Sequence, residues 1–162
     1  MESALQTIEK MSLDVVPSLM IPLAGRTLLV PTVTVAEMVP FAQAESVADA
    51  PDWLLGDFHW RDLRVPLLSF EVLNGEALPE VQPKSRIAVL NNTGVDESLP
   101  FIAVATQGIP KLARVSGEDI ATNEELTNQS FDRLQATLNG ENVVIPDVTA
   151  LENVYLEWRN SK

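Results

Sequence analysis

The only histidine of the chain, His59, lies close in the sequence to two acidic residues, Asp57 and Asp62. A carboxylate beside an imidazole can orient the ring and stabilise its protonated form, as general acid–base catalysis requires. A hydrolase or carbohydrate-active enzyme could therefore use His59, or a pair drawn from the 23 aspartate and glutamate residues. Neither pattern is specific, and an exposed strand histidine beside acids explains the same residues more simply.

Other kinds of chemistry lose support from residues and motifs that the chain lacks. There is no cysteine, which excludes a thiol nucleophile, a thiolate zinc site and an iron–sulfur cluster. Neither the Gly-x-Ser-x-Gly elbow nor the phosphate-binding Gly-x-x-x-x-Gly-Lys-Ser/Thr loop occurs. The stretch NNTGVDES, residues 91–98, resembles a hard-cation loop only faintly, and a solvated turn is the better interpretation. We expect no metal, no other cofactor and no enzymatic activity.

The charge balance bears on the partners of the protein. Eleven lysine and arginine residues face 23 acidic ones, for a formal net charge of −12. Such a surface repels nucleic acid and anionic lipid, so we expect neither nucleic-acid binding nor direct membrane insertion. The apolar run over residues 15–25 is short and is broken by Pro17 and Pro22, and the first residues do not resemble a signal peptide. These features favour a cytoplasmic protein.

The residues around His59 are typical of a β-hairpin. Phe58 and Trp60 alternate with polar neighbours, which is the period of two expected of a strand with one buried face. Residues 63–67 alternate again after a short turn. We therefore expect Trp60 to point into the core and Arg61 to point outward at the turn.

Short extended segments continue along the rest of the chain. We expect strands over residues 15–23, 27–35, 86–91, 99–108, 109–115 and 141–148, and loops over 42–51 and 77–85. Residues 35–41 fit either a strand or a last helical turn before Pro40. The polar stretch 116–139 could supply a helical turn near Glu124, and Asn139-Gly140 is a hairpin turn signal. A helix should end the chain, with Asp147 or Thr149 as its N-cap.

This order of elements predicts a mostly-β fold. A parallel α/β fold needs helices of about ten or more residues between strands, and the chain lacks them. We expect an N-terminal leader over residues 1–13 and a single barrel-like domain over residues 14–157. The two halves of the domain repeat one pattern of strands loosely, which indicates two small β subdomains.

Residues 50–71, APDWLLGDFHWRDLRVPLLSFE, resemble a segment of the CheW-like family, the adaptors of bacterial chemosensory arrays. The family pattern is Pro-x-aromatic-Ile-x-Gly-x-x-Asn-Leu-Arg-Gly-x-x-x-Pro. The residues in step with it, without a gap, are Pro51, Trp53, Leu54, Gly56, Trp60, Arg61 and Pro66. Residues 35–39, VAEMV, resemble the family's Val-x-Glu-Ile element, and residues 143–153 resemble its closing strand and helix.

The resemblance implies two small five-stranded β-barrels around a shared core, and a C-terminal helix. It also implies a non-catalytic adaptor that holds a CheA-like histidine kinase to the cytoplasmic tips of methyl-accepting chemoreceptors. The partner-binding residues would be Glu37, Gly56, His59, Arg61 and Asp62. The family has Asn where this chain has His59 and Gly where it has Asp62. These departures suggest an altered partner, as in the auxiliary adaptors of pilus-linked chemosensory systems that govern twitching motility.

Arg61 suits a docking role at the tip of a hairpin. Its guanidinium brings five fixed donors and a planar face, which can bind a carboxylate bidentately or stack on an apolar surface. A surface ion pair with Glu37, contributing at most about 1 kcal/mol, explains the same two residues without a partner. A third hypothesis, beside the adaptor and the hydrolase, is a β-barrel subunit of an unrelated assembly, for which neither Arg61 nor His59 would matter.

Overall fold

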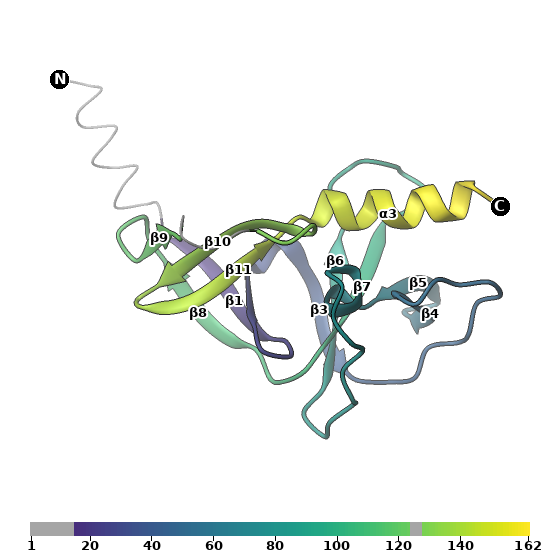
Figure 1. The fold of residues 1–162 in the computed structure, drawn as a ribbon, viewed down its shortest axis with the longest axis horizontal. Coiled ribbons are helices and arrows are strands. Elements are labelled where there is room, and N and C mark those ends of the chain that lie inside the picture. The colour runs from purple at the N-terminus through teal and green to yellow at the C-terminus, as the bar shows by residue number, and fades with distance from the viewer. Residues whose placement is uncertain (1–14, 124–127) are drawn as a thin grey trace.

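The structure is a computed structural model, and it describes residues 15–123 and 128–162. The leader expected over residues 1–13 and the helical turn expected near Glu124 lie outside these residues. Strands dominate the described chain, and the one long helix closes it (Figure 1). The elements are β1 Val16–Pro22, β2 Thr27–Pro31, η1 Thr32–Thr34, β3 Val35–Pro40, β4 Leu54–Trp60, β5 Leu63–Leu68, α2 Phe70–Leu73, β6 Arg86–Asn91, β7 Phe101–Thr106, β8 Lys111–Val115, β9 Ile120–Thr122, β10 Asp132–Leu138, β11 Glu141–Pro146 and α3 Val148–Asn160. The predicted mostly-β class is confirmed.

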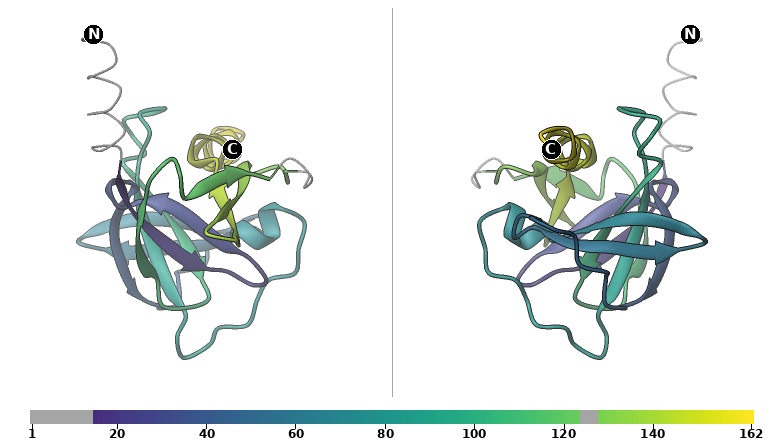
Figure 2. Two further views of the ribbon diagram at one scale, coloured as in Figure 1. Left: turned by 90° about the vertical axis from the view of Figure 1, so that its left-hand side faces the viewer. Right: turned by 90° about the vertical axis from the view of Figure 1, so that its right-hand side faces the viewer.

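The strands form two sheets that lie side by side, and α3 starts beside β11 of one sheet and runs along the other (Figures 1 and 2). One sheet has six strands in the order β8-β1-β2-β11-β10-β9, and the other has five in the order β3-β6-β7-β5-β4. The resemblance implied five strands in each subdomain, and the sixth strand of the first sheet is the three-residue β9. The two-subdomain organisation is therefore confirmed, with one short strand added.

A backbone bridge closes the five-stranded sheet. Its end strands are β3 and β4, but the chain that follows β3 returns alongside β4. The Glu45 and Asp57 backbones exchange two hydrogen bonds, with N···O distances of 2.9 Å and 2.8 Å. In the other sheet, residues 116–119 connect the end strands β8 and β9, and the Asp119 carboxylate accepts from the Ser116 hydroxyl at 2.8 Å. Each sheet is thus curved back on itself.

Buried side chains form three clusters, one between the sheets and one inside each. Successive residues of β6 alternate between two of them, because neighbouring side chains on a strand point to opposite faces. Ile87 and Val89 lie inside the five-stranded sheet, whereas Ala88 and Leu90 lie in the core shared with the six-stranded sheet. Burial of both faces explains why this segment is continuously apolar in sequence.

Helix α3 connects the two subdomains. It begins after β11 with Asp147 as N-cap, whose carboxylate accepts from the Ala150 N–H at 3.0 Å, so one of the two predicted caps is confirmed. Its buried face includes Leu151 and Leu156 in the shared core. Further along, the Arg159 guanidinium donates to the Ser98 hydroxyl at 3.0 Å, in the loop between β6 and β7. The helix therefore starts at the six-stranded sheet and covers the five-stranded one.

Two expectations about the strands need correction. No strand is predicted within the polar stretch 116–139, yet it contains β9 and β10. Leu134, Ala136 and Leu138 of β10 alternate with polar residues, a signal that the polar composition of the stretch obscures, and β10 pairs with β11 across the Asn139-Gly140 turn. The strand expected over 27–35 ends at Pro31, because proline has no N–H to donate to a continuing ladder. Residues Val35–Pro40 form β3, which settles the choice between helix and strand.

The carboxyl group of Glu71 is buried where α2 meets the β1–β2 turn. The residue is 3% exposed, and its Oε2 accepts from the Ala24 N–H at 3.2 Å. Loss of hydration on burial raises the pKa of this carboxyl, and the negative charge of Glu76 acts in the same direction. The Ala24 N–H and the Ser69 hydroxyl oppose the shift without cancelling it.

This burial predicts a pH-dependent effect of Glu71→Gln. Below the ordinary value of 4.5, the wild-type carboxyl is protonated in both the folded and the unfolded chain. As the pH rises through the raised folded-state pKa, the wild type loses the stability that protonation gave it, whereas glutamine stays neutral. Urea denaturation should show the variant gaining free energy of unfolding relative to the wild type as the pH rises above 4.5. A pH-independent difference would contradict this account.

Candidate functional site

A tight turn forms the tip of the β4–β5 hairpin. Arg61 and Asp62 join the paired residues Trp60 and Leu63, and both have positive φ, at 47° and 62°. Two central residues of positive φ make a type I′ turn, which matches the right-handed twist of the strands. Asp62 occupies a conformation that glycine adopts more easily, although aspartate tolerates it better than most residues. Arg61 lies at the exposed tip, as predicted.

One oxygen of Glu37 holds both residues at the base of the tip. Glu37 Oε1 accepts from Trp60 Nε1 at 2.9 Å and from Arg61 Nη2 at 3.1 Å. The Arg61 guanidinium lies over the Trp60 ring, 4.7 Å from its centroid, and the ring packs edge-on against Phe101 at 4.8 Å. Trp60 is buried as predicted, and the expected Glu37–Arg61 pair is confirmed.

The Glu37–Arg61 ion pair orients the guanidinium of Arg61 more than it stabilises the fold. Its side chain is 66% exposed and that of Glu37 is 40% exposed. Solvent screens such pairs, which usually contribute no more than about 1 kcal/mol, and an exposed cation–π contact adds a similar amount. The guanidinium is therefore held in one direction while most of its surface stays open to a partner.

His59 has a different acidic neighbour from those proposed. Its Nε2 lies 2.8 Å from Glu45 Oε2, so the ring is oriented by neither Asp57 nor Asp62, the two carboxylates considered from the sequence. Side chains two residues apart on one strand face are separated by about 7 Å, whereas the Glu45–Asp57 bridge brings Glu45 beside β4. The hydrogen bond from His59 lowers the pKa of Glu45, and the charge of Arg64 adds to the effect. Glu45 lay in a segment taken for a plain loop, and nothing in its sequence indicated this contact.

Gly56 is required by the same bridge. Its φ is 140°, and a Cβ atom added there would lie 2.3 Å from the Glu45 carbonyl oxygen. Only glycine lets the two backbones approach this closely. The residue is buried in β4, so it shapes the hairpin from within while His59, Arg61 and Asp62 are exposed.

The arrangement offers little for catalysis. The His59 and Glu45 side chains are both more than half exposed, which leaves them in a high-dielectric environment. Within residues 15–123 and 128–162, no group of three or more His, Cys, Asp or Glu side chains could hold a metal ion.

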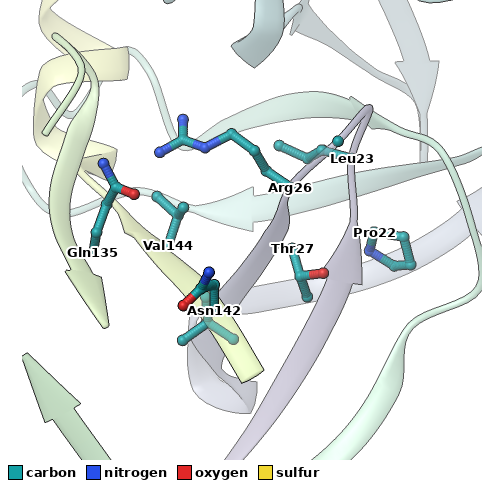
Figure 3. A pocket seen from close by; sticks show the side chains of 9 residues that line it. Pro22, Leu23, Arg26, Thr27, Gln135, Asn142 and Val144 are labelled. Atoms are coloured by element: carbon teal, nitrogen blue, oxygen red, sulfur yellow. The ribbon is translucent and has the colours of Figure 1, made fainter. Parts of the chain in front are cut away.

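A cavity of about 390 Å³ lies away from this hairpin, between β2 and β11 (Figure 3). Its only ionisable lining residue is Arg26, which donates to the buried Asp132 carboxylate at 3.0 Å. The cavity therefore brings no general acid or base to a bound molecule.

The fold and the hairpin agree with a comparison against known families. The model of the CheW-like domain matches residues 17–154. The chain belongs to the CheW-like domain family. The crystal structure of scaffolding protein TtCheW from Thermoanaerobacter tengcongensis is similar, with a TM-score of 0.70 over 82% of this chain and 88% of that chain. The two sequences are 14% identical, so this likeness concerns the fold alone. No curated protein matches the chain.

Membership in this family identifies the protein as a non-catalytic signalling adaptor of the chemotaxis type. The hydrolase hypothesis is not supported, in keeping with the exposed position of His59. Among the described helices, none has the length and apolar character needed to cross a membrane.

We expect Gly56→Ala to destabilise the fold by about 2–4 kcal/mol, because it adds a backbone clash to an unfavourable φ. Gly94→Ala is the matched control, since Gly94 also has a positive φ of 92° but open space around it. The control should cost only about 1 kcal/mol. Chemical denaturation of both variants measures the difference, and equal losses would show that the Glu45 contact is not what requires glycine.

Trp60→Ala should lower the free energy of unfolding by about 3–5 kcal/mol, because it removes a buried aromatic ring and its contact with Phe101. Arg61→Ala should change it by only about 1 kcal/mol, since the ion pair and the cation–π contact that it removes are exposed to solvent. Thermal and urea unfolding measure both. A misfolded Arg61→Ala beside a normal Trp60→Ala would refute the assignment of inward and outward faces.

Proposed function

We propose that this adaptor couples the cytoplasmic tips of methyl-accepting chemoreceptors to a CheA-like histidine kinase, and that the tip of the β4–β5 hairpin is a docking site for one of them. The observation that carries the proposal is the Arg61 guanidinium, held on the Trp60 ring by the shared Glu37 oxygen and still largely exposed. A side chain fixed in its bound direction loses less conformational entropy when a partner binds. Arginine is also enriched among the residues that dominate binding energy at interfaces.

Each of the five residues proposed for this site has a different role in binding the partner. Arg61 supplies the donors and the planar face, and Glu37 orients it. His59 and Asp62 are exposed beside it and contact the partner from the strand and the turn. Gly56 acts through the backbone, by allowing the approach of Glu45 that keeps the hairpin in place.

The departures at His59 and Asp62 support a finer assignment. Both residues lie on the exposed side of the hairpin, where a change alters what a partner meets and leaves the core intact. We place the protein among auxiliary adaptors of a pilus-linked chemosensory system, acting in twitching motility through a two-component pathway. It would work in the cytoplasm, where the kinase and the receptor tips lie.

The proposal is tested by capture of partners from a lysate of the source cell with wild-type protein, Arg61→Ala and Arg114→Ala. Arg114 is an exposed arginine on β8, so its replacement removes the same charge from the other sheet. Quantitative mass spectrometry should find a CheA-like kinase or a chemoreceptor retained by the wild type and by Arg114→Ala. Arg61→Ala should retain the same protein at least about tenfold more weakly.

Two outcomes would contradict the proposal. Retention of the same partners by all three proteins would show that the hairpin tip is not the docking site. Retention of neither a kinase nor a receptor by the wild type would favour a subunit of an unrelated assembly.

A further inference from the structure

A small cavity lies at the opposite end of β4 from the hairpin tip. Its volume is about 80 Å³, and it lies beneath residues 77–85, which connect α2 to β6. The apolar residues among those that line it are Phe41, Leu55, Leu78, Pro79, Val81 and Ala105. Leu78 and Val81 are 56% and 58% exposed, so they also present an apolar surface at the opening of the cavity.

Glu71 is the one ionisable residue that lines this cavity. It is 3% exposed, and its Oε2 accepts from the Ala24 N–H. Its Oε1 is buried and has no hydrogen-bond partner among the described residues. A buried carboxylate oxygen without a donor costs free energy, so an occupant that donates a hydrogen bond there would recover it.

The net charge of the protein favours a cation as this donor. The exposed acids Glu76 and Glu80 lie in or next to the connecting segment, as do exposed Lys84 and the partly buried Arg86, whose guanidinium already donates to the Ser85 carbonyl at 2.9 Å. The whole chain carries a net charge of −12. An acidic surface of this kind raises the local concentration of cationic groups.

The size of the cavity restricts the cation to one side chain. A water molecule occupies about 30 Å³ of the liquid, whereas sites for drug-sized ligands have roughly 300–1,000 Å³. A cavity of about 80 Å³ accepts an ammonium group and its last methylenes. Lysine is favoured over arginine because its ammonium is compact, and its aliphatic stem suits the apolar walls.

We propose that the cavity beside Glu71 is a socket for a lysine side chain of a partner protein, with the ammonium donating to Glu71 Oε1 and the methylenes packed against Leu78 and Val81. The socket lies apart from the Arg61 tip, so the proposal of a lysine socket does not depend on the role proposed for the hairpin. It gives the adaptor a second attachment point, selective for basic segments.

The socket is tested with n-butylammonium, which reproduces the end of a lysine side chain, and with n-butanol, which has the same chain without the charge. Nuclear magnetic resonance of the ¹⁵N-labelled full chain should show saturable shifts of the Leu78, Val81 and Gln107 amides on addition of n-butylammonium. n-Butanol should bind at least about tenfold more weakly. Glu71→Gln should weaken n-butylammonium binding by a similar factor.

Two further variants separate the effect of the cavity from that of the surface charge. Glu76→Gln removes an exposed acid next to the connecting segment without altering the cavity, and its affinity should stay within about twofold of the wild type. Val81→Ala keeps Glu71 and changes only an exposed wall residue, so it should bind about threefold more weakly with its fold intact. Equal binding of the two probes, unchanged binding by Glu71→Gln, or shifts that spread over the acidic surface without saturation would each overturn the proposal.

Discussion

The central strands of the five-stranded sheet, β6 and β7, have to bury both of their faces, and the rest of the architecture follows from this constraint. In β7, Ile102 and Val104 face the core shared with the six-stranded sheet, while Ala103 and Ala105 face the interior of their own sheet. A sheet covered on both sides needs a second layer, which the six-stranded sheet and α3 supply. The small side chains on the inner face of β7 leave room for the larger Phe58 and Trp60.

The same constraint makes the hairpin a rigid support. Trp60 is fixed inside the sheet by Phe101 and by its hydrogen bond to Glu37, so the turn that follows it has a defined direction. The buried Trp60 ring and the Glu37 oxygen that it shares with Arg61 together set the orientation of the guanidinium. An interaction site on such a support needs little reorganisation before binding. This is the physical basis on which an adaptor without catalytic groups can be selective.

Three buried acidic side chains form hydrogen bonds between elements that are far apart in the sequence. Glu71 in α2 accepts from the β1–β2 turn, and Glu152 on α3 accepts from the Thr93 N–H at 2.9 Å. Asp132 pairs with Arg26 from the β1–β2 turn and also accepts from the Asn74 amide at 3.3 Å. Burying a carboxylate costs free energy. At least one oxygen of each of these carboxylates accepts a hydrogen bond from a group distant in the sequence. They make the packing of the subdomains specific, and Glu71 keeps one oxygen unpaired at a cavity.

Features that depend on neighbouring residues could be predicted from the sequence alone. The alternation of Phe58 and Trp60 predicted the inward and outward faces of β4, Asn139-Gly140 predicted a turn now seen with φ of 50° and 85°, and Asp147 predicted the start of α3. The family pattern around Arg61 identified the fold. Only the tertiary structure decided which residues meet across the chain. It paired His59 with Glu45, formed β10 from a polar segment and buried Glu71. Periodicity and turn chemistry act over a few residues, whereas these contacts depend on strand register and on how the sheets close, which no short stretch of sequence contains.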